Sequence, residues 1–190
     1  MAGGTDLLPD PGKLTYEDYV TLPEDGRRYE ILDGELEVSP SPSSTHQFVL
    51  ENLAFALSSH VRACGSGRIW LAPLDVILAT TTIVQPDIVY ISNERSRIVT
   101  ERGIEAAPDL VVEILSDSTA RRDRGAKKHL YARYGISRYW LVDPTAKTLE
   151  VFALRQDGYE LLAIHREHDV AHLDTPESLA LNLSEIWRGD

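Results

Sequence analysis

The residue with the clearest chemical significance in this sequence is Glu113, a carboxylate inside the apolar segment PDLVVEILS of residues 108–116. Successive side chains of a strand point to opposite faces, so Glu113 would share its face with Val111 and Leu115. An ionised carboxylate in such surroundings is costly unless it is paired, hydrogen-bonded or bound to a metal. The position therefore indicates either a functional site or a structural ion pair with an arginine of the following helix.

A second carboxylate, Asp87, opens the apolar segment PDIVYI and lies 26 positions before Glu113. If the two segments form adjacent strands, both carboxylates reach one edge of the sheet. Magnesium keeps several waters and accepts one or two protein carboxylates together with substrate phosphate, so this pair is a candidate cation site. Taken alone, Asp87 also fits an ordinary turn residue that follows a proline at the start of a strand.

The segment after Glu113 is predicted to be helical over residues 119–134, and five of residues 121–128 are basic. Asp123, Lys127 and Tyr131 follow one another at four-residue spacing and so share one stripe of the helix. A lysine presented beside a carboxylate pair can stabilise negative charge that develops on a phosphate or an attacking water. The alternative is a solvated helix face, with an Asp123–Lys127 ion pair worth a few tenths of a kcal/mol.

Several further elements are needed to position these groups, and caps, turn residues and hydrophobic periodicity predict them. They are a short helix beginning near Thr15, a hairpin that turns at Asp33-Gly34, a helix from Ser43 or Ser44 to about Ala63, strands near 68–71, 74–79, 87–91 and 108–116, and the strands RYWLVDP, TLEVFAL and YELLAIH. The apolar tail around 179–187 is predicted to pack on the body or to join an interface, as strand or helix.

Composition indicates a soluble globular protein, because 43% of the 190 residues are hydrophobic and 26% are charged. The length fits one domain, predicted over residues 13–190 after a flexible Gly-, Pro- and Asp-rich lead-in over 1–12. Apolar runs fall far short of the roughly 20 residues that span a bilayer, and the N-terminus lacks a secretory signal, so a cytoplasmic protein is expected. The single cysteine, Cys64, excludes an internal disulfide and is expected to be at least partly buried.

The net charge of −11 argues against a nonspecific nucleic-acid binder, because Lys and Arg supply most of that affinity. The charge is unevenly distributed. Residues 1–40 hold 10 acids and 3 bases, residues 41–159 hold 13 and 14, and residues 160–190 hold 7 and 2. Acidity alone therefore excludes no functional class, since hard divalent cations also bind clustered carboxylates.

Three segments together resemble one protein family. The order and spacing of RRYEILDGELEVSPSPSSTHQ, LAPLDVILATTTIVQPDIVY and APDLVVEILSDSTARRDRGAKKHLYARYGISRYWLVDP resemble the Uma-type putative restriction endonuclease family, a branch of the PD-(D/E)XK nuclease superfamily. The resemblance covers about residues 16–154. It implies a restriction-endonuclease-like α/β (α+β) fold with a mixed central sheet flanked by helices and an N-terminal hairpin extension. It also implies Mg²⁺, with Mn²⁺ as an alternative, and hydrolysis of phosphodiester bonds.

Carried over residue by residue, the resemblance implies that Asp87 and Glu113 are metal ligands. Lys127 matches the lysine on the helix after the strand, and Glu30 matches the acidic residue of the early YEILDGEL motif. His46, in the Ser-rich stretch before the long helix, is a further candidate for the site.

The sequence departs from the family pattern at two places, and one assignment is ambiguous. In the superfamily signature a lysine lies two positions after the acid, whereas this chain has Leu115, which cannot donate a hydrogen bond to a phosphate. The usual Ser-Pro after the strand is replaced by Ser116-Asp117. Asp109 lies four residues before Glu113 on the same strand face and is a rival of Asp87 for the metal.

The preferred hypothesis is a magnesium-dependent endonuclease that acts on nucleic acid, DNA rather than RNA, with Asp87, Glu113, Lys127 and Glu30 as its catalytic residues. A homodimer is expected, because restriction-like folds often act as dimers to reach two strands. The competing hypothesis is an inactive nucleic-acid- or protein-binding module on the same fold, motivated by Leu115 and the acidic charge. A hydrolase of another phosphate ester or nucleotide is a third reading.

Overall fold

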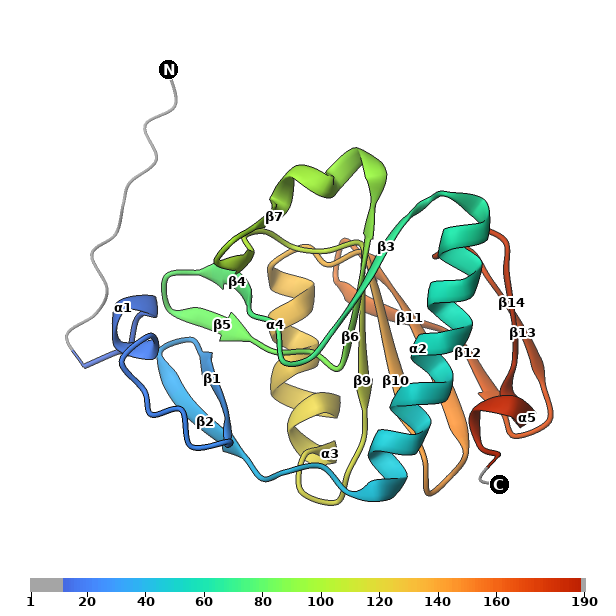
Figure 1. The fold of residues 1–190 in the computed structure, drawn as a ribbon, viewed down its shortest axis with the longest axis horizontal. Coiled ribbons are helices and arrows are strands. Elements are labelled where there is room, and N and C mark those ends of the chain that lie inside the picture. Colours follow the sequence, from blue (N-terminus) through green and yellow to red (C-terminus); the bar gives the residue numbers. More distant parts are fainter. Residues whose placement is uncertain (1–11, 189–190) are drawn as a thin grey trace.

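The structure is a computed structural model that describes residues 12–188, so the lead-in predicted over 1–12 lies, apart from Gly12, outside the described residues. Figure 1 shows two sheets with a helical segment between them and a long helix on the outer face of the second sheet. A two-stranded hairpin and a short terminal helix complete that outer layer. The predicted mixed α/β architecture with helices flanking a central sheet is confirmed.

The first sheet contains the predicted N-terminal hairpin and is larger than the sequence indicated. Its six strands run in the order β2 (Glu35–Ser39), β1 (Arg28–Leu32), β5 (Thr82–Val84), β4 (Val76–Ala79), β8 (Gly103–Ile104) and β7 (Val99–Thr100). Asp33 and Gly34 both have positive φ, 55° and 87°, as a two-residue hairpin turn requires. The short helix α1 (Tyr16–Tyr19) is also present. Strand β5, which the sequence did not predict, joins the hairpin to the rest of this sheet.

The second sheet is the mixed central sheet, and it positions the candidate carboxylates. Its order is β12 (Gly158–Arg166), β11 (Thr148–Arg155), β10 (Arg138–Asp143), β9 (Leu110–Ile114), β6 (Ile88–Ser92) and β3 (Gly67–Leu71). Strands β9 and β10 are parallel, whereas β6 and β9 are antiparallel with Ile88 opposite Val112. The predicted strands TLEVFAL and YELLAIH are β11 and β12, and they pair with each other in antiparallel orientation.

Two longer helical segments cover opposite faces of this sheet. Helix α2 (Ser44–Cys64) begins after Ser43, whose side chain accepts a hydrogen bond from the backbone N of His46, and ends at Gly65, which has a left-handed φ of 62°. Helices α3 (Ala120–Arg122) and α4 (Lys128–Arg133) are joined by a π-helical turn, η2 (Asp123–Lys127), and form the predicted helix. A 3₁₀ segment, η1 (Asn93–Ile98), follows β6.

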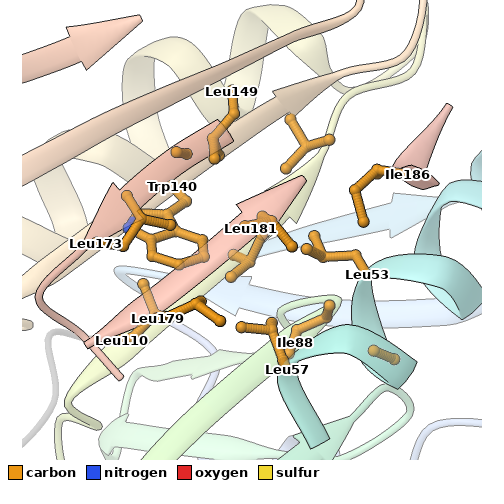
Figure 2. Packing of buried hydrophobic residues seen from close by; sticks show 14 of the residues in the cluster. Leu53, Leu57, Ile88, Leu110, Trp140, Leu149, Leu173, Leu179, Leu181 and Ile186 are labelled. Carbon is orange, nitrogen blue, oxygen red and sulfur yellow. The ribbon is translucent and has the colours of Figure 1, made fainter. Parts of the chain in front are cut away.

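The chain ends in both of the structures that the sequence left open. Its tail forms a hairpin of β13 (Val170–Leu173) and β14 (Leu179–Asn182) and then helix α5 (Leu183–Ile186). Figure 2 shows Leu179, Leu181 and Ile186 packed against side chains of α2 and the second sheet. The tail therefore closes this core.

Two hydrophobic cores follow from strand alternation. One lies between α2, the terminal hairpin and one face of the second sheet, and includes Leu110, Val112 and Ile114. The other lies between the two sheets around α4 and includes Val111 and Leu115. Cys64, which was expected to be at least partly buried, is exposed in the last turn of α2, so that expectation was wrong.

Candidate active site

The two carboxylates predicted to meet at one sheet edge do so. Asp87 immediately precedes β6, and Glu113 lies on the adjacent strand β9. The backbone N of Ile114 donates a 2.8 Å hydrogen bond to Oδ2 of Asp87, which fixes the first carboxylate beside the residue that follows the second. Both side chains are buried, with 2% of each residue exposed.

Glu113 is held by the helical segment that crosses between the two sheets. Its Oε1 accepts hydrogen bonds from Nζ of Lys127 at 2.9 Å and from the hydroxyl of Tyr131 at 2.6 Å. Asp123, Lys127 and Tyr131 form one stripe as predicted, and all three are buried. The interpretation of this stripe as a solvated face is therefore wrong, because the sheet that contains β1 covers it.

Glu30, on β1, completes the contacts of the same lysine. Its Oε1 lies 2.8 Å from Nζ of Lys127 and accepts a 2.8 Å hydrogen bond from the backbone N of Gln85. Its Oε2 lies 3.5 Å from Nη2 of Arg122. The structure thus brings Glu30, Glu113 and Lys127 into direct contact, with Glu30 supplied by the first sheet and Glu113 by the second.

Asp87 is surrounded by hydrogen-bond donors. Both terminal nitrogens of Arg28 donate to its Oδ1, at 3.0 and 3.1 Å. Nε2 of His46 lies 3.2 Å from Oδ2, and the other ring nitrogen, Nδ1, is buried with no hydrogen-bond partner among the described residues. His46 therefore lies at the site, in the first turn of α2.

The carboxylates around Asp87 and Glu113 outnumber the permanent cations beside them. The carboxylates of Glu30, Asp87, Glu113 and Asp123 face three permanent cations, which are Arg28, Arg122 and Lys127. We refer to these seven residues as the charge cluster.

The excess of carboxylates affects the protonation of Glu113 most strongly. Burial, reinforced by the charges of Asp123, Asp87 and Glu30 and opposed by Lys127, raises the pKa of Glu113 to about 8. Burial opposes the charged form of Lys127, but Glu113, Glu30 and Asp123 raise its pKa above the ordinary value. Lys127 is therefore protonated at neutral pH, and Glu113 is the carboxylate that would gain most from one more positive charge.

The donor set fits a hard divalent cation in chemistry. Asp87 and Glu113 offer oxygens from adjacent strands, and the charge cluster contains one carboxylate more than permanent cations. Two protein carboxylates suffice for magnesium, which retains waters and takes further oxygens from substrate phosphate. Residues 12–188 contain no group of three or more His, Cys, Asp or Glu side chains arranged to hold a metal. The fit therefore requires ligands from water and substrate in addition to these two.

A cavity of about 730 Å³ opens beside Asp87. Its inner wall includes Arg28, His46 and Asp87, whereas Glu113 and Lys127 lie behind this wall and do not line it. Much of the remaining lining carries hydroxyl groups, namely those of Ser39, Ser41, Ser43, Thr45, Ser116, Ser118, Thr119 and Thr145. The cavity can thus admit a polar ligand that reaches Asp87 directly.

The structure clarifies the departures from the expected motif. Leu115 is buried in the core around α4, and the ammonium that contacts Glu113 comes from Lys127 on the helical segment. Asp109, the rival ligand, lies near the other end of β9, where its carboxylate accepts hydrogen bonds from Nη1 of Arg95 at 3.0 Å and from the backbone N of Ser92 at 2.8 Å. Asp109 is therefore no part of the charge cluster.

Sequence reasoning missed the arginines of the cluster. Arg28 and Glu30 are two positions apart on β1 and so share a face, a signal that alternation could have supplied. The basic residues of the helix were identified without their partners: Arg122 pairs with Glu30 and Glu37, and Arg124 pairs with Asp143 and Glu150. The partners of these two arginines are distant in sequence, so spacing alone could not identify them.

The family comparison covers most of the chain. A family model described as "Uma2: Putative restriction endonuclease" matches residues 16–184. An uncharacterized protein of Synechocystis sp. is 29% identical over 180 residues, which are 93% of this chain and 93% of that protein.

A solved structure has a similar fold. The crystal structure of a putative nuclease belonging to DUF820 from Anabaena variabilis is 23% identical, covers 92% of this chain and 97% of its own, and has a TM-score of 0.74. At this identity the likeness concerns the fold alone. No helix within residues 12–188 has both the length and the hydropathy needed to cross a membrane.

Proposed function

Because this chain belongs to the Uma2 family of putative restriction endonucleases, we propose that it is a metal-dependent endonuclease that hydrolyses phosphodiester bonds in nucleic acid, DNA rather than RNA. The observation that carries the proposal is the charge cluster. Two buried carboxylates, Asp87 and Glu113, meet at the end of adjacent strands, and a buried lysine contacts one of them. The open cavity beside Asp87 gives a phosphate access to this edge.

In this proposal Asp87 and Glu113 hold Mg²⁺, with Mn²⁺ as a substitute. When bound, the cation supplies charge to a phosphate oxygen and lowers the pKa of a coordinated water. Lys127 keeps its proton at neutral pH and therefore contributes positive charge rather than acting as a base. Glu30 positions that ammonium, because its Oε1 contacts Nζ at 2.8 Å and is itself fixed by the backbone N of Gln85.

The test is cleavage of matched DNA and RNA substrates with and without Mg²⁺. Asp87→Asn and Glu113→Gln are expected to abolish Mg²⁺-dependent cleavage, because each replaces a carboxylate that can hold the cation by an amide that cannot ionise. Asp109→Asn is the matched control, since Asp109 also accepts bonds from an arginine and a backbone N but lies outside the cluster. Full cleavage by Glu113→Gln, or equal loss in Asp109→Asn, would refute the assignment.

One observation favours an inactive binding module as the second candidate. The oxygens Oδ1 of Asp87 and Oε1 of Glu113 already contact the protein's own cations, Arg28 and Lys127, which is an arrangement that also serves stability alone. An inactive module should show no stabilisation by Mg²⁺ or Mn²⁺ in thermal unfolding, whereas a bound cation raises stability by mass action. It should also bind DNA or a protein partner without cleaving it.

The proposed assembly is a homodimer of single domains, each spanning residues 13–190, in the cytoplasm, which holds the nucleic acid that the activity requires. A single domain is supported by the shared cores, since the helical segment packs between both sheets and the tail packs on α2. A dimer would present two sites to the two strands of a duplex. Light scattering after size-exclusion chromatography tests it, and a monomeric mass would contradict it.

A further inference from the structure

Arg28 is the cation of the charge cluster that also faces the cavity. It reaches Asp87 from β1, and 26% of its side chain is exposed. Lys127 and Arg122 form ion pairs with Glu30, and neither side chain lines the cavity. Within the charge cluster, which lies wholly among the described residues, Arg28 is therefore the one permanent cation that a ligand entering the cavity can touch.

The contact between Arg28 and Asp87 engages only one of the two carboxylate oxygens. Both terminal nitrogens donate to the same oxygen, Oδ1. A guanidinium fork fits best against two oxygens, as in a bidentate pair with a carboxylate or a phosphate. Arg28 thus holds Asp87 through one oxygen while its geometry suits a ligand that offers two.

The same oxygen is the one that a metal would need. Oδ2 of Asp87 already contacts the backbone N of Ile114 and Nε2 of His46, which leaves Oδ1 as the oxygen shared with Arg28 alone. A guanidinium and a divalent cation compete for this oxygen, because like charges at such separations repel in a partly buried site. We therefore expect a cation that binds at Oδ1 to displace Arg28 from Asp87.

The cavity provides the place to which Arg28 can turn. Its lining is rich in neutral hydroxyls, and the other acid there besides Asp87 is the exposed Asp117. Resting on the proposed function, we infer that Arg28 is a substrate-binding residue that exchanges partners. It neutralises Asp87 in the metal-free protein, and it binds the substrate phosphate in the cavity once Asp87 holds a divalent cation.

Manganese binding without nucleic acid tests the first half of this exchange. Arg28→Gln removes the competitor, so its Mn²⁺ affinity in calorimetry should rise on the order of tenfold, the factor expected when one charge-assisted bond need not be broken. Arg95→Gln is the matched control: it removes the same charge from a partly exposed side chain that pairs with another aspartate, Asp109, and does not line this cavity. This control should bind Mn²⁺ much as the native protein does, and Arg28→Lys should lie between native and Arg28→Gln.

Binding of a short DNA oligonucleotide, with Ca²⁺ in place of Mg²⁺, tests the second half. Arg28→Gln should weaken binding on the order of tenfold through the lost charge-assisted phosphate contact, and Arg95→Gln, outside the cavity, should weaken it much less. Circular dichroism checks that each variant folds. If Arg28→Gln does not fold, Arg28→Lys, which keeps the positive charge at Asp87, is compared with native protein instead.

The outcomes separate this inference from the proposed function. If native protein and Arg28→Gln both fail to bind Mn²⁺, the metal site itself is refuted and the exchange falls with it. If native protein binds Mn²⁺ and Arg28→Gln or Arg28→Lys binds it no more tightly, only the exchange is refuted. Unchanged oligonucleotide binding by these variants would refute the phosphate contact.

Discussion

Replacing Lys127 by methionine should be among the most destabilising single changes in the chain. The Lys127 side chain is 1% exposed, and its Nζ lies 2.8 Å from Glu30, 2.9 Å from Glu113 and 4.0 Å from Asp123. Methionine keeps much of the apolar stem but leaves three carboxylates without their shared cation. Removing one partner of a buried pair costs about 3–5 kcal/mol, because the remaining charge stays buried.

At this chain length, 1 kcal/mol corresponds to a change in Tm of roughly 2–4 °C, so Lys127→Met should lower Tm by about 6–20 °C. Urea unfolding followed by circular dichroism measures the free energy of unfolding. Lys128→Met is the matched control, because the neighbouring ammonium lies over the ring of Phe152 and its loss should cost about 1 kcal/mol or less.

A double variant tests the physical reason. Because Glu30 has a lowered pKa and stays ionised, Glu30→Gln removes one of the orphaned carboxylates, and the pair Glu30→Gln/Lys127→Met should be less destabilised than the sum of the single changes, by about 1–3 kcal/mol. If Lys127→Met lost less than about 1 kcal/mol, or if the two changes were simply additive, the buried charge cluster would not have the energetic role assigned to it here.

Three further predictions follow from the same contacts. The pKa of Glu113 is raised from 4.5 to about 8, so its contribution to stability is full below about pH 4.5 and is lost as the pH rises through 8. In urea unfolding, native protein should therefore lose stability relative to Glu113→Gln between pH 5 and 8.5. A difference between the two proteins that stays constant with pH would contradict this. Tyr131→Phe removes the hydroxyl that donates to Glu113 and should cost about 1–2 kcal/mol by the same measurement, and no loss would mean that Glu113 does not depend on this bond. Mn²⁺ at about 100 times its Kd should stabilise native protein and Asp109→Asn by about 2.7 kcal/mol in thermal unfolding but should leave Asp87→Asn unchanged, and equal stabilisation of all three would place the cation elsewhere.

The sequence predicted those parts of the fold that depend on local signals. The hairpin at Asp33-Gly34 and the helix between Ser43 and Gly65 have turn or cap residues that act within a few positions, and both were correct. Strand β5 is three residues long, too short for alternation to stand out, and its partners lie in two other segments. The tail was ambiguous because it contains both a strand and a helix within eight residues.

The candidate site divides in the same way. An acid within an apolar strand was enough to single out Glu113 as a candidate site residue. The four-residue spacing of Asp123, Lys127 and Tyr131 was enough to place Lys127 on one stripe of the following helix. The contact of Arg28 with Asp87 depends on how the first sheet packs against the second, and no local sequence pattern encodes that packing. For the same reason the partners of the basic helix were not identified, because its arginines pair with acids that are 19 to 92 positions away.

The π-helical turn at Asp123–Lys127 bears on how this site would respond to a deletion. In a regular α-helix, positions eight residues apart drift by about 80°, yet Asp123 and Tyr131 are both buried on the stripe of Lys127. The wider turn takes up that drift by holding one residue more than a regular helical turn. Deleting the exposed Ala126 would keep every charged residue and permit an unbroken α-helix, in which Asp123 and Tyr131, seven residues apart, would still lie within about 20° of one stripe. The segment should therefore tolerate the loss of this one residue better than it tolerates replacement of its buried charged residues.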